Sequence, residues 1–176
     1  MSLTPQNISD IRDSWQALAA EPEALTADFY ETLFRHDPAL RPLFGATDMA
    51  GQGRKLSAAI ALVVKSADDL APVLAPLEAL GARHVVYGVQ DCDYDTVGAA
   101  LIETMSRRLG AGFTPATRDA WLAAYGAVAG TMLSGAAAAR RCWCRRTFMS
   151  RASSMTTIRP PKSWLWSCTR PTRSPP

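Results

Sequence analysis

Hydrophobic residues recur every three or four positions along most of this chain, which is the spacing of helices that bury one face. A strict alternation of apolar and polar residues between turns, typical of half-buried strands, is found nowhere in the sequence. The pattern predicts roughly six or seven short helices with brief connections. We therefore expect an all-α domain with more helices than a simple four-helix bundle.

Capping residues and prolines mark where these helices begin. Asp and Thr side chains accept hydrogen bonds from the free N–H groups of a first turn, and proline fits the first helical position. Gly110 and Gly112 are expected to end the helix before the last one. The expected helix starts are Thr4 before Pro5, Glu21 before Pro22, Asp37 before Pro38, Asp48, Asp68 or Asp69, Asp93, and Thr114 before Pro115.

The size and composition fit one globular domain. The chain has 176 residues, 48% of them hydrophobic, which is enough to bury a core. Its first residues pass directly into an amphipathic pattern, without the basic and apolar regions of a secretory signal. No apolar run is expected to approach the ~20 residues of a membrane span. We expect a cytoplasmic protein that does not bind a membrane.

The end of the chain differs from the rest in charge and composition. The net charge is +3, yet residues 1–139 contain all 16 acidic residues and only 10 of the 19 basic ones. Residues 140–176 hold the other basic residues and most of the cysteines and tryptophans, without a helical or strand period. We expect a domain over residues 1–136 and a tail over 137–176 that is disordered or translated out of frame. A basic arm for nucleic acid is the alternative, but we expect no nucleic-acid partner.

One of the two histidines stands on an apolar helix face. Leu77, Leu80, His84 and Tyr87 follow helical spacing, which brings the imidazole among hydrophobic side chains. A lone histidine in such a place is more often a core residue with a satisfied hydrogen bond than a ligand. Both interpretations stay open on position alone.

The shortage of other ligands narrows what His84 could bind. Zinc and non-haem iron need three or four protein ligands. His36 is expected to be exposed in a turn, and Cys92 is isolated in the sequence. Haem differs because the porphyrin fills four positions, so that one histidine suffices. The residues are compatible with haem and poorly compatible with most other metals.

Several short segments lie in order along about residues 3–135 and together are specific. They are residues 28–34, 37–44, 52–56, 80–84, 94–98 and 120–126. On these segments the chain resembles the globin family, closest to the haem domain of bacterial flavohaemoglobins and single-domain bacterial haemoglobins. The resemblance implies a globin fold of six to eight helices around a haem pocket, with haem b and its iron as cofactor.

The resemblance also implies roles for individual residues. His84 matches the proximal ligand of haem iron, and Phe44 matches the phenylalanine that packs against the porphyrin. Tyr30 and Gln52 match distal residues whose hydroxyl and amide groups donate to the O2 ligand, and Leu56 closes the pocket. The alternatives are ordinary core packing for Phe44, a structural hydrogen bond for Tyr30, and a solvated helix start for Gln52.

The proximal side departs from the flavohaemoglobin pattern. There a glutamate in the last helix, with the tyrosine matched by Tyr94, hydrogen-bonds the proximal imidazole and raises its basicity. The matching position here is Ala136. Tyr94 alone, or the carbonyl of Leu80, is expected to orient His84, with a weaker electron push on the iron.

Three functions remain possible on these grounds. The first is a nitric oxide dioxygenase that binds O2 and uses a separate flavin and nicotinamide reductase, since no such domain and no Gly-rich phosphate loop is expected after residue 136. The second is an O2 storage or delivery protein without turnover. The third is a haem-free globin-fold sensor or interaction module. We expect O2 binding, and whether the protein is an enzyme stays open.

Overall fold

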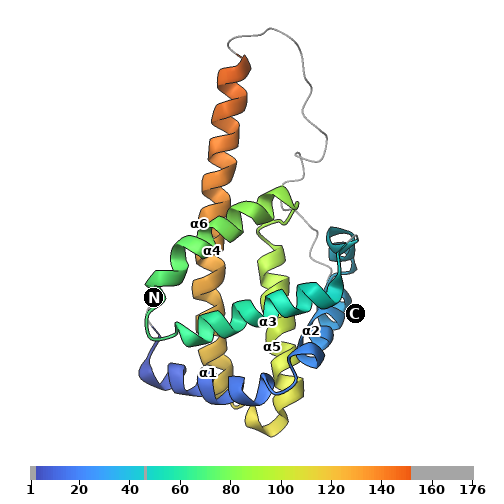
Figure 1. The fold of residues 1–176 in the computed structure, drawn as a ribbon, viewed down its shortest axis with the longest axis vertical. Helices are drawn as coiled ribbons and strands as arrows, with labels where there is room; N and C mark the ends of the chain where they lie inside the picture. Colours follow the sequence, from blue (N-terminus) through green and yellow to red (C-terminus); the bar gives the residue numbers. More distant parts are fainter. Residues whose placement is uncertain (1–2, 46, 152–176) are drawn as a thin grey trace, which may run out of the picture. The chain divides into compact units, whose positions relative to one another are not determined.

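The computed structural model describes residues 3–45 and 47–151, and it contains helices and no strand in that part of the chain (Figure 1). The all-α prediction is therefore confirmed. The elements are α1 (Pro5–Leu18), α2 (Pro22–His36), the 3-10 helix η1 (Pro38–Phe44), α3 (Met49–Lys65), α4 (Ala71–Val86), α5 (Asp93–Leu109), the 3-10 turn η2 (Gly110–Gly112) and α6 (Pro115–Arg151).

Most helices begin where the capping pattern predicts. The Thr4 hydroxyl accepts from the Asn7 N–H at the start of α1, and Thr114 accepts from Thr117 at the start of α6. Asp37, Asp48 and Asp69 accept in the same way before η1, α3 and α4. Of the two aspartates expected to cap α4, Asp69 makes the contact. Glu21 makes no side-chain cap, so Pro22 alone marks the start of α2.

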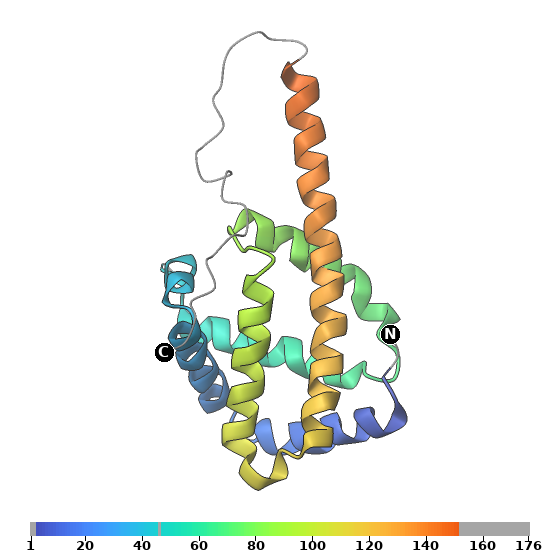
Figure 2. The ribbon, with the colours of Figure 1, turned by 180° about the vertical axis from the view of Figure 1, so that it is seen from behind.

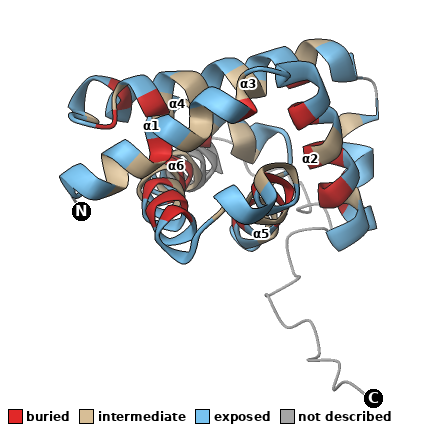
Figure 3. Ribbon diagram, turned by 90° about the horizontal axis from the view of Figure 1, so that it is seen from below, coloured by how far each residue is buried: buried red, intermediate tan, exposed pale blue. Residues whose placement is uncertain are grey.

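The helices of the first part of the chain cross one another around a shared core. The ribbon shows α5 and the first part of α6 side by side, with α1, α3 and α4 crossing them (Figure 2). Buried positions lie on the inward faces of the helices (Figure 3). Trp121 of α6 is buried, and its Nε1–H donates to the Ser14 hydroxyl of α1 at 2.9 Å. The largest fully buried side chains are Ile11, Leu18, Leu25, Leu33, Met105, Thr32 and Thr104.

The chain divides into two compact units, residues 1–139 and residues 140–176. This division falls close to the expected boundary at residue 136, which stays a prediction. Helix α6 continues through it to Arg151, although the sequence pattern predicts no helix there. The alanines at 136–139 and the two arginines that follow have high helix propensity, which explains the continuation. Residues 152–176, the rest of the expected tail, lie outside the described residues.

One described helix, Pro115–Arg141, is long and apolar enough by length and composition to cross a membrane. The sequence-based expectation that no run approaches that length is therefore wrong for α6. A helix that supplies a soluble core passes the same test, and α6 carries the buried core residues Trp121, Ala124 and Met132. Only 22% of that apolar window is buried.

Candidate ligand site

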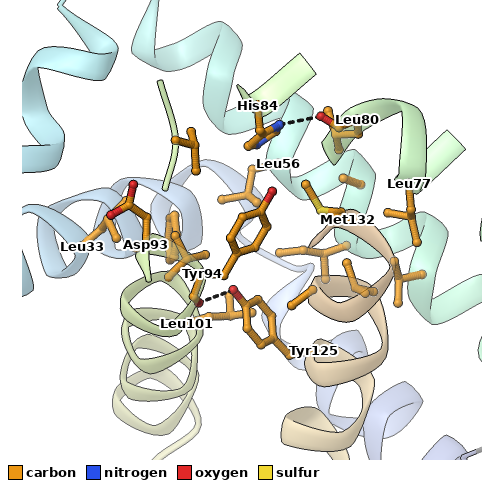
Figure 4. A pocket seen from close by; sticks show the side chains of 18 of the residues that line it. Leu33, Leu56, Leu77, Leu80, His84, Asp93, Tyr94, Leu101, Tyr125 and Met132 are labelled. Atoms are coloured by element: carbon orange, nitrogen blue, oxygen red, sulfur yellow. Dashed lines mark hydrogen bonds between the residues drawn. The ribbon is translucent and has the colours of Figure 1, made fainter. Parts of the chain in front are cut away.

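An apolar cavity of about 430 Å³ lies within the first unit (Figure 4). Side chains from α2, η1, α3, α4, α5 and α6 line it, and nearly all of them are hydrocarbon or aromatic. The charged or imidazole groups among them are Arg83, His84 and Asp93. This size and lining are typical of a site for a largely apolar ligand that a few polar groups orient.

His84 lines this cavity and is held in one orientation by its own helix. Its Nδ1 lies 2.9 Å from the main-chain oxygen of Leu80, one turn earlier in α4 (Figure 4). A carbonyl oxygen only accepts, so Nδ1 carries a proton and donates it. In the neutral ring Nε2 then keeps its lone pair, which is the form that ligates a metal. The expectation that Leu80 could orient His84 is met.

Two tyrosines extend the same wall of the cavity. The Tyr94 ring lies 6.3 Å from the His84 ring between centroids, and its hydroxyl end points toward His84 in Figure 4. The Tyr125 hydroxyl donates to the main-chain oxygen of Tyr94, tying α6 to the start of α5. Burial raises the pKa of Tyr125, and the neighbouring Tyr94 and Asp95 add to the effect. The Tyr125 phenol is therefore a proton donor over the physiological pH range.

Of the residues matched to the distal side, Phe44 and Leu56 line the cavity. Phe44 packs edge-on against Tyr30, with ring centroids 5.5 Å apart. Tyr30 is buried but lines a second, smaller hollow beside α2 and α3, together with Thr26 and Met49. Neither Tyr30 nor Gln52 is among the residues that line the main cavity. The structure brings four of the six predicted residues to the cavity, His84, Phe44, Leu56 and Tyr94.

Tyr30 and Gln52 contact each other. The Gln52 side chain hydrogen-bonds the Tyr30 hydroxyl, which lowers the pKa of the phenol, while burial raises it by more. The net direction is upward, so Tyr30 keeps its proton well above neutral pH. Both groups can therefore donate hydrogen bonds, and their action on a ligand stays a prediction.

The two helices beside His84 approach each other closely at two glycines. A Cβ on Gly81 of α4 would stand 1.9 Å from the Met132 main-chain oxygen of α6. A Cβ on Gly135 of α6 would stand 2.0 Å from the Glu78 main-chain oxygen of α4. The sequence pattern did not predict this contact, although Gly81 interrupts the predicted helix that carries His84. Ala136, at the expected glutamate position, is 1% exposed.

Other metal centres find no support among the described residues, where no three His, Cys, Asp or Glu side chains gather as a ligand set. His36 contacts Glu103 through Nε2 at 2.6 Å, and Cys92 is exposed. The site therefore offers a single imidazole at an apolar cavity, and it suits a cofactor that brings its own equatorial ligands.

The family model of the globins matches residues 27–132, which is more than half of the chain. This chain belongs to the globin family. The matched segment includes α3, α4 and α5 and most of the cavity wall, so this globin's cavity lies within the part that defines the family. The resemblance stated from the sequence is confirmed.

Its curated relatives include longer proteins. This globin is 33% identical over 125 residues to the "Flavohemoprotein" of Vibrio cholerae serotype O1, covering 70% of this chain and 32% of the relative. It is also 33% identical over 133 residues to the "Flavohemoprotein" of Bordetella pertussis, covering 74% of this chain and 33% of the relative. The chain thus spans about a third of the length of these relatives.

Proposed function

We propose that this globin binds haem b in the main cavity, with His84 Nε2 as the protein ligand to iron, and that it binds O2 reversibly. The observation that carries the proposal is the 2.9 Å contact from Nδ1 to the Leu80 carbonyl, because it leaves the other ring nitrogen available. The globin family match and the relatives' name support the choice of cofactor. A non-covalent haem fits, since no cysteine is among the described residues that line the cavity.

Different residues of the cavity would contact different parts of such a group. Phe44 and Leu56 present apolar surface on one side, and Met132 and Leu80 do so next to His84. These side chains would exclude water from the bound group, which would protect it from oxidation. Arg83 lines the cavity, and its guanidinium would pair with carboxylates on the bound group. When bound, the haem iron would supply reversible coordination of O2.

The imidazole should act as a moderately basic ligand. A main-chain carbonyl accepts its Nδ1 proton, and a carbonyl is a weaker acceptor than a carboxylate, so the ring stays close to a neutral imidazole. The buried Ala136 offers no carboxylate in place of the missing glutamate. This arrangement supports reversible O2 binding better than chemistry that needs a strong electron push.

Nitric oxide dioxygenation with a separate flavin and nicotinamide reductase is the finer part of the proposal. Tyr30 and Gln52 both keep protons that can be donated to a polar ligand, and the flavohaemoprotein relatives make this reaction class the first to test. Storage or delivery of O2 without turnover is the competing function. It uses the same cavity and differs only in whether nitric oxide is consumed.

A haem titration tests the first part of the proposal. The purified protein should give a Soret band on adding haem and a spectral change with O2, and His84→Ala should lose both. His36→Ala is the matched control, since His36 is the chain's other histidine and contacts Glu103 outside the cavity. Normal haem binding with a histidine-ligated spectrum in His84→Ala would refute the assignment.

Nitric oxide consumption under O2 tests the second part. A generic flavin reductase and a nicotinamide are added, and the rate is compared with and without the haem-loaded globin. Consumption that depends on the globin supports a dioxygenase. O2 binding without such consumption supports storage or delivery.

A further inference from the structure

Two glycines hold α4 and α6 at backbone contact distance next to His84. Gly81 lies against the Met132 main-chain oxygen and Gly135 against that of Glu78, and both glycines are buried. In each case the atom that an added Cβ would meet, at 1.9 Å and 2.0 Å, belongs to the backbone. Rotation of a side chain cannot relieve such a contact, so one helix would have to move.

The contact is reciprocal, and its Gly81 half lies within one helical turn of His84. Gly81 directly follows Leu80, whose main-chain oxygen accepts a hydrogen bond from His84. Gly81 and His84 are three residues apart and are therefore neighbours on the surface of α4. Met132, which meets Gly81 through its main chain, lines the cavity through its side chain. Any displacement at this contact therefore changes both the position of the imidazole and the wall beside it.

Not every glycine of α6 makes such a contact. A Cβ on Gly126 or Gly130 would meet nothing within 4 Å, and both residues are exposed. Glycine lowers the stability of a helix interior relative to alanine at all these positions. The close approach of the two backbones explains why glycine stands at positions 81 and 135. Nothing in the structure explains why glycine stands at positions 126 and 130. The chain thus provides its own controls.

We propose that Gly81 and Gly135 are positioning residues for His84, which set the distance between α4 and α6 and thereby the place of Nε2 in the cavity. The proposal rests on the proposed function in naming haem as the group that Nε2 meets. The geometric part concerns the chain alone. A merely structural role would lower stability but would leave the properties of the imidazole and of its bond to iron unchanged.

The experiment compares Gly81→Ala and Gly135→Ala with Gly130→Ala as control. In the haem-loaded proteins, haem loss to apomyoglobin should quicken about 10-fold in the first two variants, the scale at which misplaced metal ligands lose affinity. The Fe–His stretching frequency should shift in both. Gly130→Ala should match the parent protein in both measurements.

A second measurement uses the haem-free protein. Nitrogen-15 labelling of histidine gives signals from only two rings, His84 and His36. The ring signals of His84 should move in Gly81→Ala and Gly135→Ala, while those of His36, which contacts Glu103, should not. Should one variant fail to fold, the other tests the same contact from the opposite helix.

The outcomes separate the two proposals. Folded variants whose His84 signals, haem loss and Fe–His frequency equal those of Gly130→Ala would overturn the positioning role. A parent protein that binds no haem would refute the proposed function, while the nitrogen-15 comparison would still decide whether the glycines position the ring.

Discussion

The proximal side of the cavity, made by α4 and α6 around His84, is arranged differently from the distal side, made by α2 and α3 around Tyr30 and Gln52. On the proximal side the imidazole donates to the Leu80 carbonyl and lines the cavity. On the distal side Tyr30 and Gln52 hydrogen-bond each other, and neither lines it. The difference teaches that the proposed iron ligand is held by its own helix in the cavity, whereas the proposed distal donors contact each other and lie outside the residues that line it.

Side-chain packing on the proximal side should contribute more to the free energy of unfolding than packing on the distal side. Met132 is 8% exposed and packs beside Tyr94 on the proximal side, so Met132→Ala should lower the free energy of unfolding by about 2–3 kcal/mol. Leu56 is only half-buried at the distal edge, and Leu56→Ala should lower it by about 1 kcal/mol. Urea unfolding of the haem-free proteins measures both. An equal or reversed order would contradict the comparison.

The distal pair should matter for holding O2 if it reaches the ligand. Tyr30→Phe removes the buried hydroxyl, and loss of a hydrogen bond to a charged group corresponds to about a 10-fold faster O2 dissociation. Stopped-flow displacement of O2 by carbon monoxide measures the rate. Tyr87→Phe is the control, because Tyr87 is 62% exposed. An unchanged rate in Tyr30→Phe would mean that the pair stays outside the cavity.

The proximal ligand should be less activated than in relatives with a carboxylate beside the imidazole. Because a carbonyl accepts the Nδ1 proton, resonance Raman of the ferrous protein should give an Fe–His stretching frequency typical of a neutral imidazole. A frequency as high as that of peroxidases would show a strong acceptor and would contradict the role of Leu80.

The stability of the folded protein should fall at alkaline pH because the buried Tyr125 ionises less readily than a tyrosine in the unfolded chain. Burial raises the pKa of Tyr125 in the folded state, whereas an unfolded tyrosine ionises near pH ~10. The contribution of this group to stability is therefore complete below that pH and is lost as the pH rises above it. Tyr125→Phe should lose less stability than the parent between about pH 9 and 11. Urea unfolding at the two pH values measures this, and equal losses would refute the shift.

Local signals in the sequence predicted the helices and part of the site. Thr4, Asp37, Asp48 and Thr114 cap the helices as expected, because capping depends on residues within one turn. The helical spacing predicted Leu77, Leu80 and His84 on one apolar face, and these three line the cavity. Tyr87, expected on the same face, is 62% exposed. The ordered matches to globins indicated which kind of ligand the cavity suits, and helical periodicity alone could not indicate this.

Features that depend on contacts between helices could not be predicted. The approach of Gly81 to Met132 joins residues that are far apart in sequence, and no helical pattern encodes the distance between two helices. The hydrogen bond between Tyr30 and Gln52 likewise depends on how α2 crosses α3. The extension of α6 to Arg151 was not predicted because this segment has no apolar face, whereas alanine and arginine form helices without one.

Ligation by His84 Nε2 is the central claim, and chemical rescue tests it most directly. His84→Gly removes the imidazole and leaves a space beside the cavity, which free imidazole can enter. The variant should lose the histidine-ligated haem spectrum, and added imidazole should restore it, with no such effect in His36→Gly. A His84→Gly protein that keeps a histidine-ligated spectrum without imidazole would contradict the claim.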